Sequence, residues 1–142
     1  MNVAHNRWES GRAFQTLAKQ CISRATGQEF SPEFPYPIGT PPRPHRFDLV
    51  SEDRRIVVEC KCYTWTSGGK TPQGKISTLI EALYYMSFLP ETGIRIIAIN
   101  KAITPGKTET LAAYFFRTYR HLLRAVQLWE IDEEGQITVY QN

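Results

Sequence analysis

The stretch RFDLVSEDRRIVVECKCY, residues 46–63, contains two apolar runs separated by a short polar turn. Arg46–Ser51 and Arg55–Tyr63 are rich in apolar and β-branched residues, and Glu52–Arg54 separates them. Two such runs joined by a few polar residues are typical of an antiparallel hairpin. We therefore expect the chain to build its sheet around this hairpin.

Charged side chains interrupt this apolar hairpin. Asp48 lies on its first strand, and Glu59 and Lys61 lie on its second. Because strand side chains alternate, Glu59 and Lys61 share one face, whereas Cys60 and Cys62 lie on the opposite, apolar face. Burying an isolated charge is costly, so the charged group requires a partner or a function.

A metal site is the functional interpretation of this group. Asp48 and Glu59 offer the hard oxygen ligands that suit Mg²⁺, with Mn²⁺ as a substitute, and the carbonyl of Cys60 adds a third oxygen. Lys61 would contact an attacking water or the phosphate oxygens and stabilise charge in the transition state. The alternative is a solvated strand face on which Glu59 and Lys61 form an ordinary ion pair.

The segments before the hairpin predict a helix and an edge strand. Arg7–Ala25 is expected to be helical because apolar residues recur along one face and Gly27 follows as a stop signal. Six prolines lie between Ser31 and His45. Proline removes ladder donors and fixes φ, so this stretch predicts an extended arm or edge segment, not a central strand.

The segments after the hairpin predict two helices and three strands. Thr71 is expected to cap a helix that has Pro72 at its first position and ends near Pro90. Its inward face is predicted to comprise Ile76, Leu79, Ile80, Leu83 and Ser87. The remaining predicted elements are a strand covered on both faces at Ile94–Asn100, a helix at Thr108–Arg124, and a hairpin formed by Val126–Ile131 and Gln136–Tyr140.

This element order predicts an α/β fold in one domain, residues 1–142, with a mixed sheet flanked by helices. The hydrophobic share of 42% excludes a disordered chain, and the net charge of +3 permits a polyanionic partner. No apolar run is long enough to cross a membrane. Three cysteines and an N-terminus without a secretory pattern predict a cytoplasmic protein without a disulfide framework.

The segments FDLV and IVVECK, with Asp48, Glu59 and Lys61 in the spacing D-x10-E-x-K, resemble the PD-(D/E)XK nuclease superfamily. This resemblance covers about residues 5–100 and departs from the family pattern in having Phe47 where proline often precedes the first aspartate. It implies a restriction-endonuclease-like core of αβββαβ order, here followed by a C-terminal helix and hairpin. By the same resemblance, Asp48 and Glu59 bind the metal and Lys61 assists the nucleophile.

The resemblance also implies further site residues. Many members place a glutamate of the first helix at the metal, and Glu9 is the candidate, although it lies away from the apolar stripe and a solvated or capping role is the alternative. A Gln or Lys of the following helix often reaches the site, which makes Gln73 and Lys75 candidate phosphate contacts. Arg46 is a further candidate DNA contact.

Three other motifs give weaker signals. Residues 69–75 fit G-x-x-x-x-G-K, but Ile76 stands where a P-loop needs Ser or Thr, so a nucleotide hydrolase is rejected. The pair Cys60 and Cys62 with His45 suggests zinc less than it suggests buried structural thiols.

The third motif is a basic stripe on the helix predicted at Thr108–Arg124. Arg117, Arg120, His121 and Arg124 follow helical spacing, with Glu109 outside the stripe. The stripe would bind DNA phosphates or be a solvated face.

The sequence therefore favours a Mg²⁺-dependent DNA nuclease, expected to be an endonuclease and to act as a homodimer if it cuts both strands. The first alternative is a non-catalytic nucleic-acid-binding or assembly domain with the same fold. The second is an unrelated enzyme in which the E-x-K spacing is coincidental.

Overall fold

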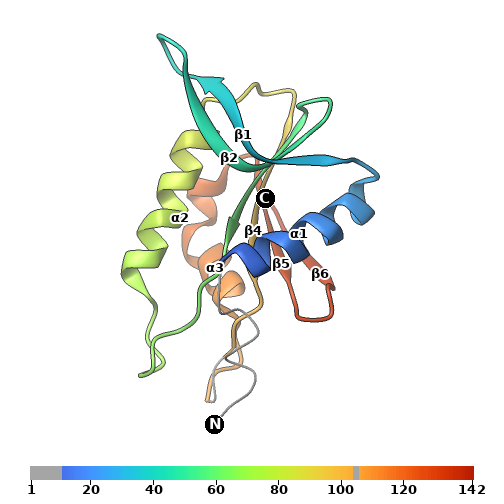
Figure 1. Ribbon diagram of the computed structural model, residues 1–142. Helices are drawn as coiled ribbons and strands as arrows, with labels where there is room; N and C mark the ends of the chain where they lie inside the picture. Colours follow the sequence, from blue (N-terminus) through green and yellow to red (C-terminus); the bar gives the residue numbers. More distant parts are fainter. Residues whose placement is uncertain (1–10, 104–105) are drawn as a thin grey trace.

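The computed structural model describes residues 11–103 and 106–142. They form a six-stranded mixed sheet with helices on both faces (Figure 1). The elements are α1 (Gly11–Thr26), β1 (Phe30–Ile38), β2 (Arg43–Ser51), β3 (Ile56–Lys61), α2 (Gln73–Met86), β4 (Ile94–Asn100), α3 (Leu111–Leu123), β5 (Val126–Ile131) and β6 (Ile137–Tyr140). The expected mixed α/β fold is confirmed.

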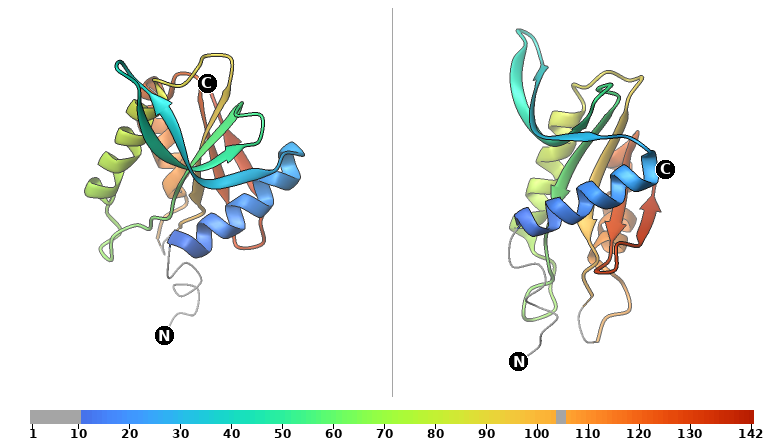
Figure 2. Two further views of the ribbon diagram at one scale, coloured as in Figure 1. Left: turned by 45° about the horizontal axis from the view of Figure 1, so that its top comes forward. Right: turned by 45° about the vertical axis from the view of Figure 1, so that its right-hand side comes forward.

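The sheet has the strand order β1-β2-β3-β4-β5-β6. The neighbours β3, β4 and β5 run parallel, and the other pairs are antiparallel. Helices α2 and α3 lie together on one face, and α1 crosses the other (Figure 2). Parallel strands need helical crossovers, which explains why α2 and α3 cover one face of the central strands, and α1 covers the other.

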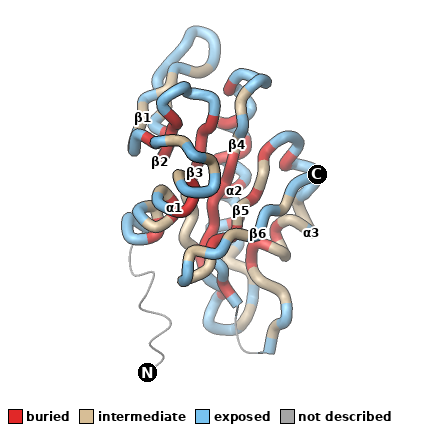
Figure 3. The backbone as a smooth tube through the Cα atoms, turned by 90° about the vertical axis from the view of Figure 1, so that its right-hand side faces the viewer, coloured by how far each residue is buried: buried red, intermediate tan, exposed pale blue. Residues whose placement is uncertain are grey.

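The central strands are apolar on both faces, as predicted for Ile94–Asn100. Ile97 and Ile99 pack in the core under α2 and α3, whereas Ile96 and Ala98 pack in the core under α1. Figure 3 shows buried residues gathered along β3 and β4. The predicted alternation in β3 is also confirmed, because Val57 and Val58 belong to different cores.

The proline-rich stretch forms the edge strand β1, which confirms the expectation of an edge segment. It pairs antiparallel with β2 from Phe30↔Ser51 to Ile38↔Arg43. Because this pairing reaches Arg43, β2 begins three residues earlier than predicted. The β1–β2 hairpin extends past the end of α2 (Figure 1).

The predicted cap of α2 was wrong. Pro72 occupies the N-cap position without a side-chain hydrogen bond, and the helix begins at Gln73. The hydroxyl of Thr71 instead accepts a hydrogen bond from the Gln73 side chain at 3.0 Å. Pro72 has a ψ of 83°, outside the helical range, so it takes the N-cap position itself and Thr71 lies one residue before the cap.

The inward face of α2 is rotated slightly from the prediction. Ile76, Leu79 and Leu83 are buried as expected, but Ile80 is 36% exposed and Ser87 is exposed. Ala82 and Met86 are buried in their place. The helix packs against both the sheet and α3, so residues on one side of the predicted stripe are buried and those on the other side remain exposed to solvent.

The two other helices match the predicted positions with shorter bounds. In α1 the predicted apolar stripe is buried at Phe14, Ala18 and Ile22, and residues 7–10 lie outside the described part. Helix α3 begins after Thr110, whose hydroxyl accepts a hydrogen bond from the Ala113 N–H at 3.1 Å. Within the described residues, no helix has the length and apolar composition needed to span a membrane.

Candidate active site

Asp48 and Glu59 meet where the ladder between β2 and β3 ends. The ladder pairs Leu49 with Val58, so Asp48 lies opposite Glu59. The Asp48 N–H donates to Oε1 of Glu59 at 3.1 Å, and the Cys60 N–H donates to Oδ2 of Asp48 at 2.7 Å. At this position the two side-chain carboxylates, in place of main-chain carbonyls, accept the hydrogen bonds between the strands, and these bonds fix both carboxylates.

Both carboxylates lie in surroundings that disfavour their charged forms. Glu59 is only 8% exposed. Burial raises its pKa to about 7, with a further increase from the Asp48 charge and an opposing effect of Lys61. Burial also raises the pKa of Asp48, against the hydrogen bond from Cys60. A cation at this position would reverse both effects, because an opposite charge favours the ionised form.

Lys61 belongs to the same group, as the sequence predicted. Its Nζ lies 3.9 Å from Oε2 of Glu59, and both side chains are largely buried. At this distance the ammonium group offsets part of the carboxylate charge. The structure therefore brings together Asp48, Glu59 and Lys61.

The protein ligand set for a metal would be small. Within residues 11–103 and 106–142, no three His, Cys, Asp or Glu side chains are grouped so as to hold a metal ion. Mg²⁺ is commonly bound through one or two carboxylates and keeps several waters. Two opposed carboxylates with raised pKa values fit that kind of binding, whereas they do not fit a cage built from protein ligands alone.

Sequence analysis missed two polar side chains beside Asp48. The Gln15 amide on α1 donates to the Asp48 carbonyl at 3.2 Å and to Oε1 of Glu33 at 3.3 Å. Glu33 lies on β1 with φ +54°, and its charge also raises the pKa of Asp48. No local pattern marks either residue, because their positions depend on how α1 and β1 pack. Glu9, the predicted helix carboxylate, lies outside the described residues.

His45 also lies close to the site, and its role is different from the zinc ligand considered above. Its ring stacks on Tyr85 with 3.9 Å between centroids and meets Phe47 edge-on. Burial lowers its pKa, while the charges of Asp48 and Glu81 oppose that effect. In the sequence, the spacing of His45 and Phe47 two residues apart on β2 was the feature that could have indicated this aromatic cluster.

The cysteines behave as structural thiols. Cys60 and Cys62 pack against the core under α1 and form no disulfide. Burial raises the pKa of Cys62 to about 11 and that of Cys60 well above the usual thiol range. Zinc binds thiolates, so these protonated thiols support the structural interpretation.

The start of α2 reaches the strand end that carries the site. Lys75 places its ammonium 5.7 Å from the centre of the Tyr63 ring. Tyr63 is fixed by two main-chain hydrogen bonds to the Asn100 side chain and by a hydroxyl contact with Thr78. Lys75 therefore lies over Tyr63, two residues beyond the end of β3, whereas the Gln73 side chain is turned to Thr71.

The predicted DNA-contacting arginines have partners within the protein. Arg46 is exposed and donates to the Glu33 carbonyl at 3.3 Å. Glu109 precedes α3 and lies outside the stripe, as expected, but it forms a two-point ion pair with Arg117 at 2.8 and 3.0 Å. Arg120 contacts Asn142.

Arg124 is exposed and has a positive φ of +53° at the end of α3. None of the three α3 arginines forms a hydrogen bond or ion pair with Asp48 or Glu59 within the described residues.

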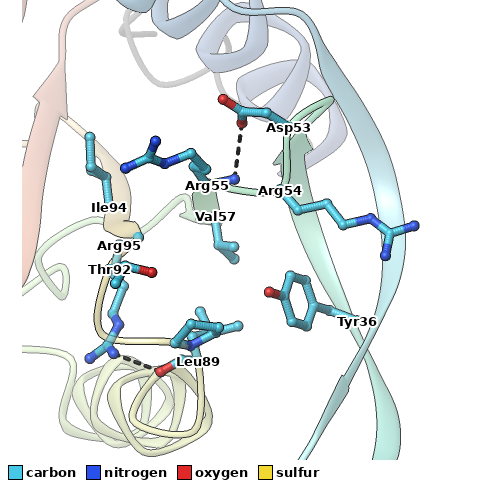
Figure 4. Close-up of a pocket in the computed structure, with 11 residues that line it drawn as sticks. Tyr36, Asp53, Arg54, Arg55, Val57, Leu89, Thr92, Ile94 and Arg95 are labelled. Atoms are coloured by element: carbon cyan, nitrogen blue, oxygen red, sulfur yellow. Dashed lines mark hydrogen bonds between the residues drawn. The ribbon is translucent and has the colours of Figure 1, made fainter.

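A small pocket of about 160 Å³ lies elsewhere, at the other end of β3 and β4. Val57, Leu89 and Ile94 contribute to its lining. Figure 4 shows Arg54 directed away from its centre and Arg95 turned toward the Leu89 carbonyl, to which it donates at 2.7 Å. The pocket contains none of the predicted catalytic residues, because Glu59 and Lys61 lie at the opposite end of β3.

Comparison with known proteins gives little further information. No family model and no curated protein matches this chain. Among solved structures it is similar to the structure of Pyrococcus furiosus SfsA in complex with Ca²⁺, at 15% identity and a TM-score of 0.38. That similarity covers 92% of this chain and 61% of the other, so this chain spans less than two thirds of that protein's length. A similarity of this size assigns neither a family nor a function.

Proposed function

We propose that this chain is a Mg²⁺-dependent DNA nuclease of the PD-(D/E)XK kind, which hydrolyses phosphodiester bonds. The observation that carries the proposal is the opposed pair formed by the half-buried Asp48 and the buried Glu59. Both carboxylates have raised pKa values, and the Lys61 ammonium lies 3.9 Å from the Glu59 carboxylate. A divalent cation would turn this unfavourable pair into a binding site.

Each residue of the site has a distinct role in this proposal. Asp48 and Glu59 hold the cation, with the Cys60 carbonyl as a third protein oxygen. Bound Mg²⁺ supplies Lewis-acid stabilisation of the phosphate and lowers the pKa of a bound water. Lys61 places a positive charge where negative charge develops on the phosphate oxygens. Lys75 and Arg46 contact the neighbouring phosphates of the strand.

The alternative function is a nucleic-acid-binding or assembly domain without catalysis. The Asp48–Glu59 pair argues against it, because a pure phosphate binder gains nothing from two carboxylates where a polyanion docks. An unrelated enzyme with a coincidental E-x-K would retain the buried pair but would not cut DNA.

Cleavage of supercoiled plasmid and branched DNA with Mg²⁺ or Mn²⁺ tests the proposal. We expect wild type to cut and Glu59→Gln to lose at least about 10²-fold in rate, as when a key electrostatic group is removed. Glu130→Gln is the matched control, since Glu130 is a 4% exposed glutamate of the same sheet. It should cut like wild type.

Equal metal-dependent cleavage by Glu59→Gln and wild type would overturn the proposal. DNA binding by wild type without cleavage of any substrate in either metal would favour the non-catalytic alternative. The plasmid products also test the expected homodimer, because paired sites linearise the plasmid whereas a single site nicks it.

A further inference from the structure

A cleft of about 610 Å³ lies between the tip of the β1–β2 hairpin and the end of α2. Ile38, Pro41 and Arg43 line it from the hairpin, and Tyr85 and Phe88 line it from the helix end. Its volume lies within the range of about 300–1,000 Å³ that is usual for sites of small organic groups. The hairpin projects over this end of α2, which explains why the cleft forms there (Figure 2).

The cleft offers aromatic surface to the solvent. Phe88 is 45% exposed, and its neighbour Tyr84 is 66% exposed and meets it edge-on. On the inner side, His45 and Tyr85 form a stacked pair. Unpaired nucleic-acid bases stack on such rings with little sequence preference, because every base has a π-face.

The charge of the cleft suits a nucleotide better than an apolar protein surface. Arg43 supplies a positive charge to its lining, which includes no carboxylate among the described residues. An occupant that uses both the aromatic rings and the Arg43 guanidinium must combine a flat base with a phosphate.

The cleft also adjoins the candidate active site. His45 precedes Asp48 by three residues on β2, which corresponds to roughly 10 Å at about 3.3 Å per residue. We propose that the cleft binds an unpaired nucleotide next to the phosphate to be cut, so that the substrate is duplex DNA joined to a single-stranded segment. This inference rests on the proposed nuclease function.

Fluorescence anisotropy in EDTA tests the cleft without requiring catalysis. It compares a blunt duplex with the same duplex carrying a short single-stranded overhang. We expect wild type to bind the overhang DNA about tenfold more tightly, and Phe88→Ala to bring this ratio close to one, because one base loses its stacking surface. Leu122→Ala on α3, where Leu122 is 40% exposed, is the matched control and should keep the wild-type ratio.

Two results with Phe88→Ala would overturn the inference. The first is an equal ratio for Phe88→Ala and wild type. The second is that wild type sediments as a dimer, Phe88→Ala does not, and the variant binds both DNAs more weakly by the same factor. This result would make the cleft an interface between copies of the chain.

The inference and the proposed function can fail separately. If the wild-type protein cuts DNA with metal but shows no overhang preference, the proposed nuclease function stands and the proposed role of the cleft is wrong. If the wild-type protein shows the expected ratio of affinities but cuts no DNA, the proposed role of the cleft stands and the proposed nuclease function is wrong.

Discussion

The Asp48 N–H donates a hydrogen bond to the Glu59 carboxylate, and these two residues are also the predicted carboxylate ligands of the metal. The Asp48 carboxylate in turn accepts from the Cys60 N–H. These bonds extend the contact between β2 and β3 beyond the last ladder pair, Leu49 and Val58. Because the main chain holds both carboxylates, they cannot move apart freely to relieve repulsion, and the binding of a proton or a cation offsets it.

The raised pKa of Glu59 predicts how the stability of the metal-free protein depends on pH. Its pKa is about 7 in the folded state against 4.5 without perturbation, so the folded state binds more protons between these values. Stability should therefore fall as the pH rises through this window, by at most about 3 kcal/mol from this group. Urea unfolding in EDTA measures it.

Two variants isolate the contribution of Glu59. Glu59→Gln should remove the loss, whereas Glu130→Gln should retain it. Burial lowers the pKa of His45, which acts in the opposite direction, so the difference between variant and wild type is the informative quantity. An identical pH slope in Glu59→Gln and wild type would show that Glu59 does not titrate in this window.

Asp48→Asn should separate repulsion from metal binding. The amide oxygen can still accept from the Cys60 N–H, and one buried charge is removed. In EDTA we expect the variant to be at least as stable as wild type. With Mg²⁺ at a hundredfold excess over Kd, wild type should gain about 2.7 kcal/mol and the variant little. Melting curves with and without metal decide, and a destabilised variant with an unchanged metal shift would make Asp48 a structural residue.

Lys61→Ala should retain Mg²⁺ binding and lower the cleavage rate by roughly 10²–10³-fold, because one electrostatic stabiliser of the transition state is lost. Calorimetric titration with Mg²⁺ and single-turnover cleavage measure the two effects. Lys61→Arg keeps the charge and should recover part of the rate. Wild-type turnover in Lys61→Ala would remove this residue from the mechanism.

The salt dependence of DNA binding tests the basic stripe on α3. If the stripe contacts phosphates, Arg120→Gln and Arg124→Gln should each reduce the log–log slope by about 0.9. Arg117→Gln should change it less, because Glu109 already pairs with that guanidinium. Glu109→Gln is the reverse test and should tighten binding. Unchanged slopes in all variants would indicate that the stripe is a solvated face that does not contact DNA.

Gly93→Ala tests the junction between α2 and β4. A Cβ at Gly93 would lie 2.8 Å from the Arg55 carbonyl oxygen, which accepts the Ile94 N–H. We expect a loss of about 1–3 kcal/mol in unfolding free energy, as for other overpacked positions. Gly74→Ala in α2 meets no atom within 4 Å and should be neutral or slightly stabilising. Equal stabilities of the two variants would contradict this packing.

The sequence alone determined the elements that local patterns control. The polar turn Glu52–Arg54 and its flanking runs predicted the β2–β3 hairpin, and the apolar run at Ile94–Asn100 predicted a strand buried on both faces. Side-chain alternation in a strand is fixed by backbone geometry, so the faces of Glu59 and Cys60 followed from their positions. The hairpin then placed Asp48 and Glu59 together.

Only the tertiary structure decided which distant segments complete the site. Gln15 and Glu33 lie beside Asp48 because α1 and β1 pack against β2, and His45 meets Tyr85 because the hairpin crosses α2. Glu109 pairs with Arg117 through the loop before α3. Contacts of this kind depend on strand register and helix placement, which the whole core fixes, so no local spacing of residues encodes them.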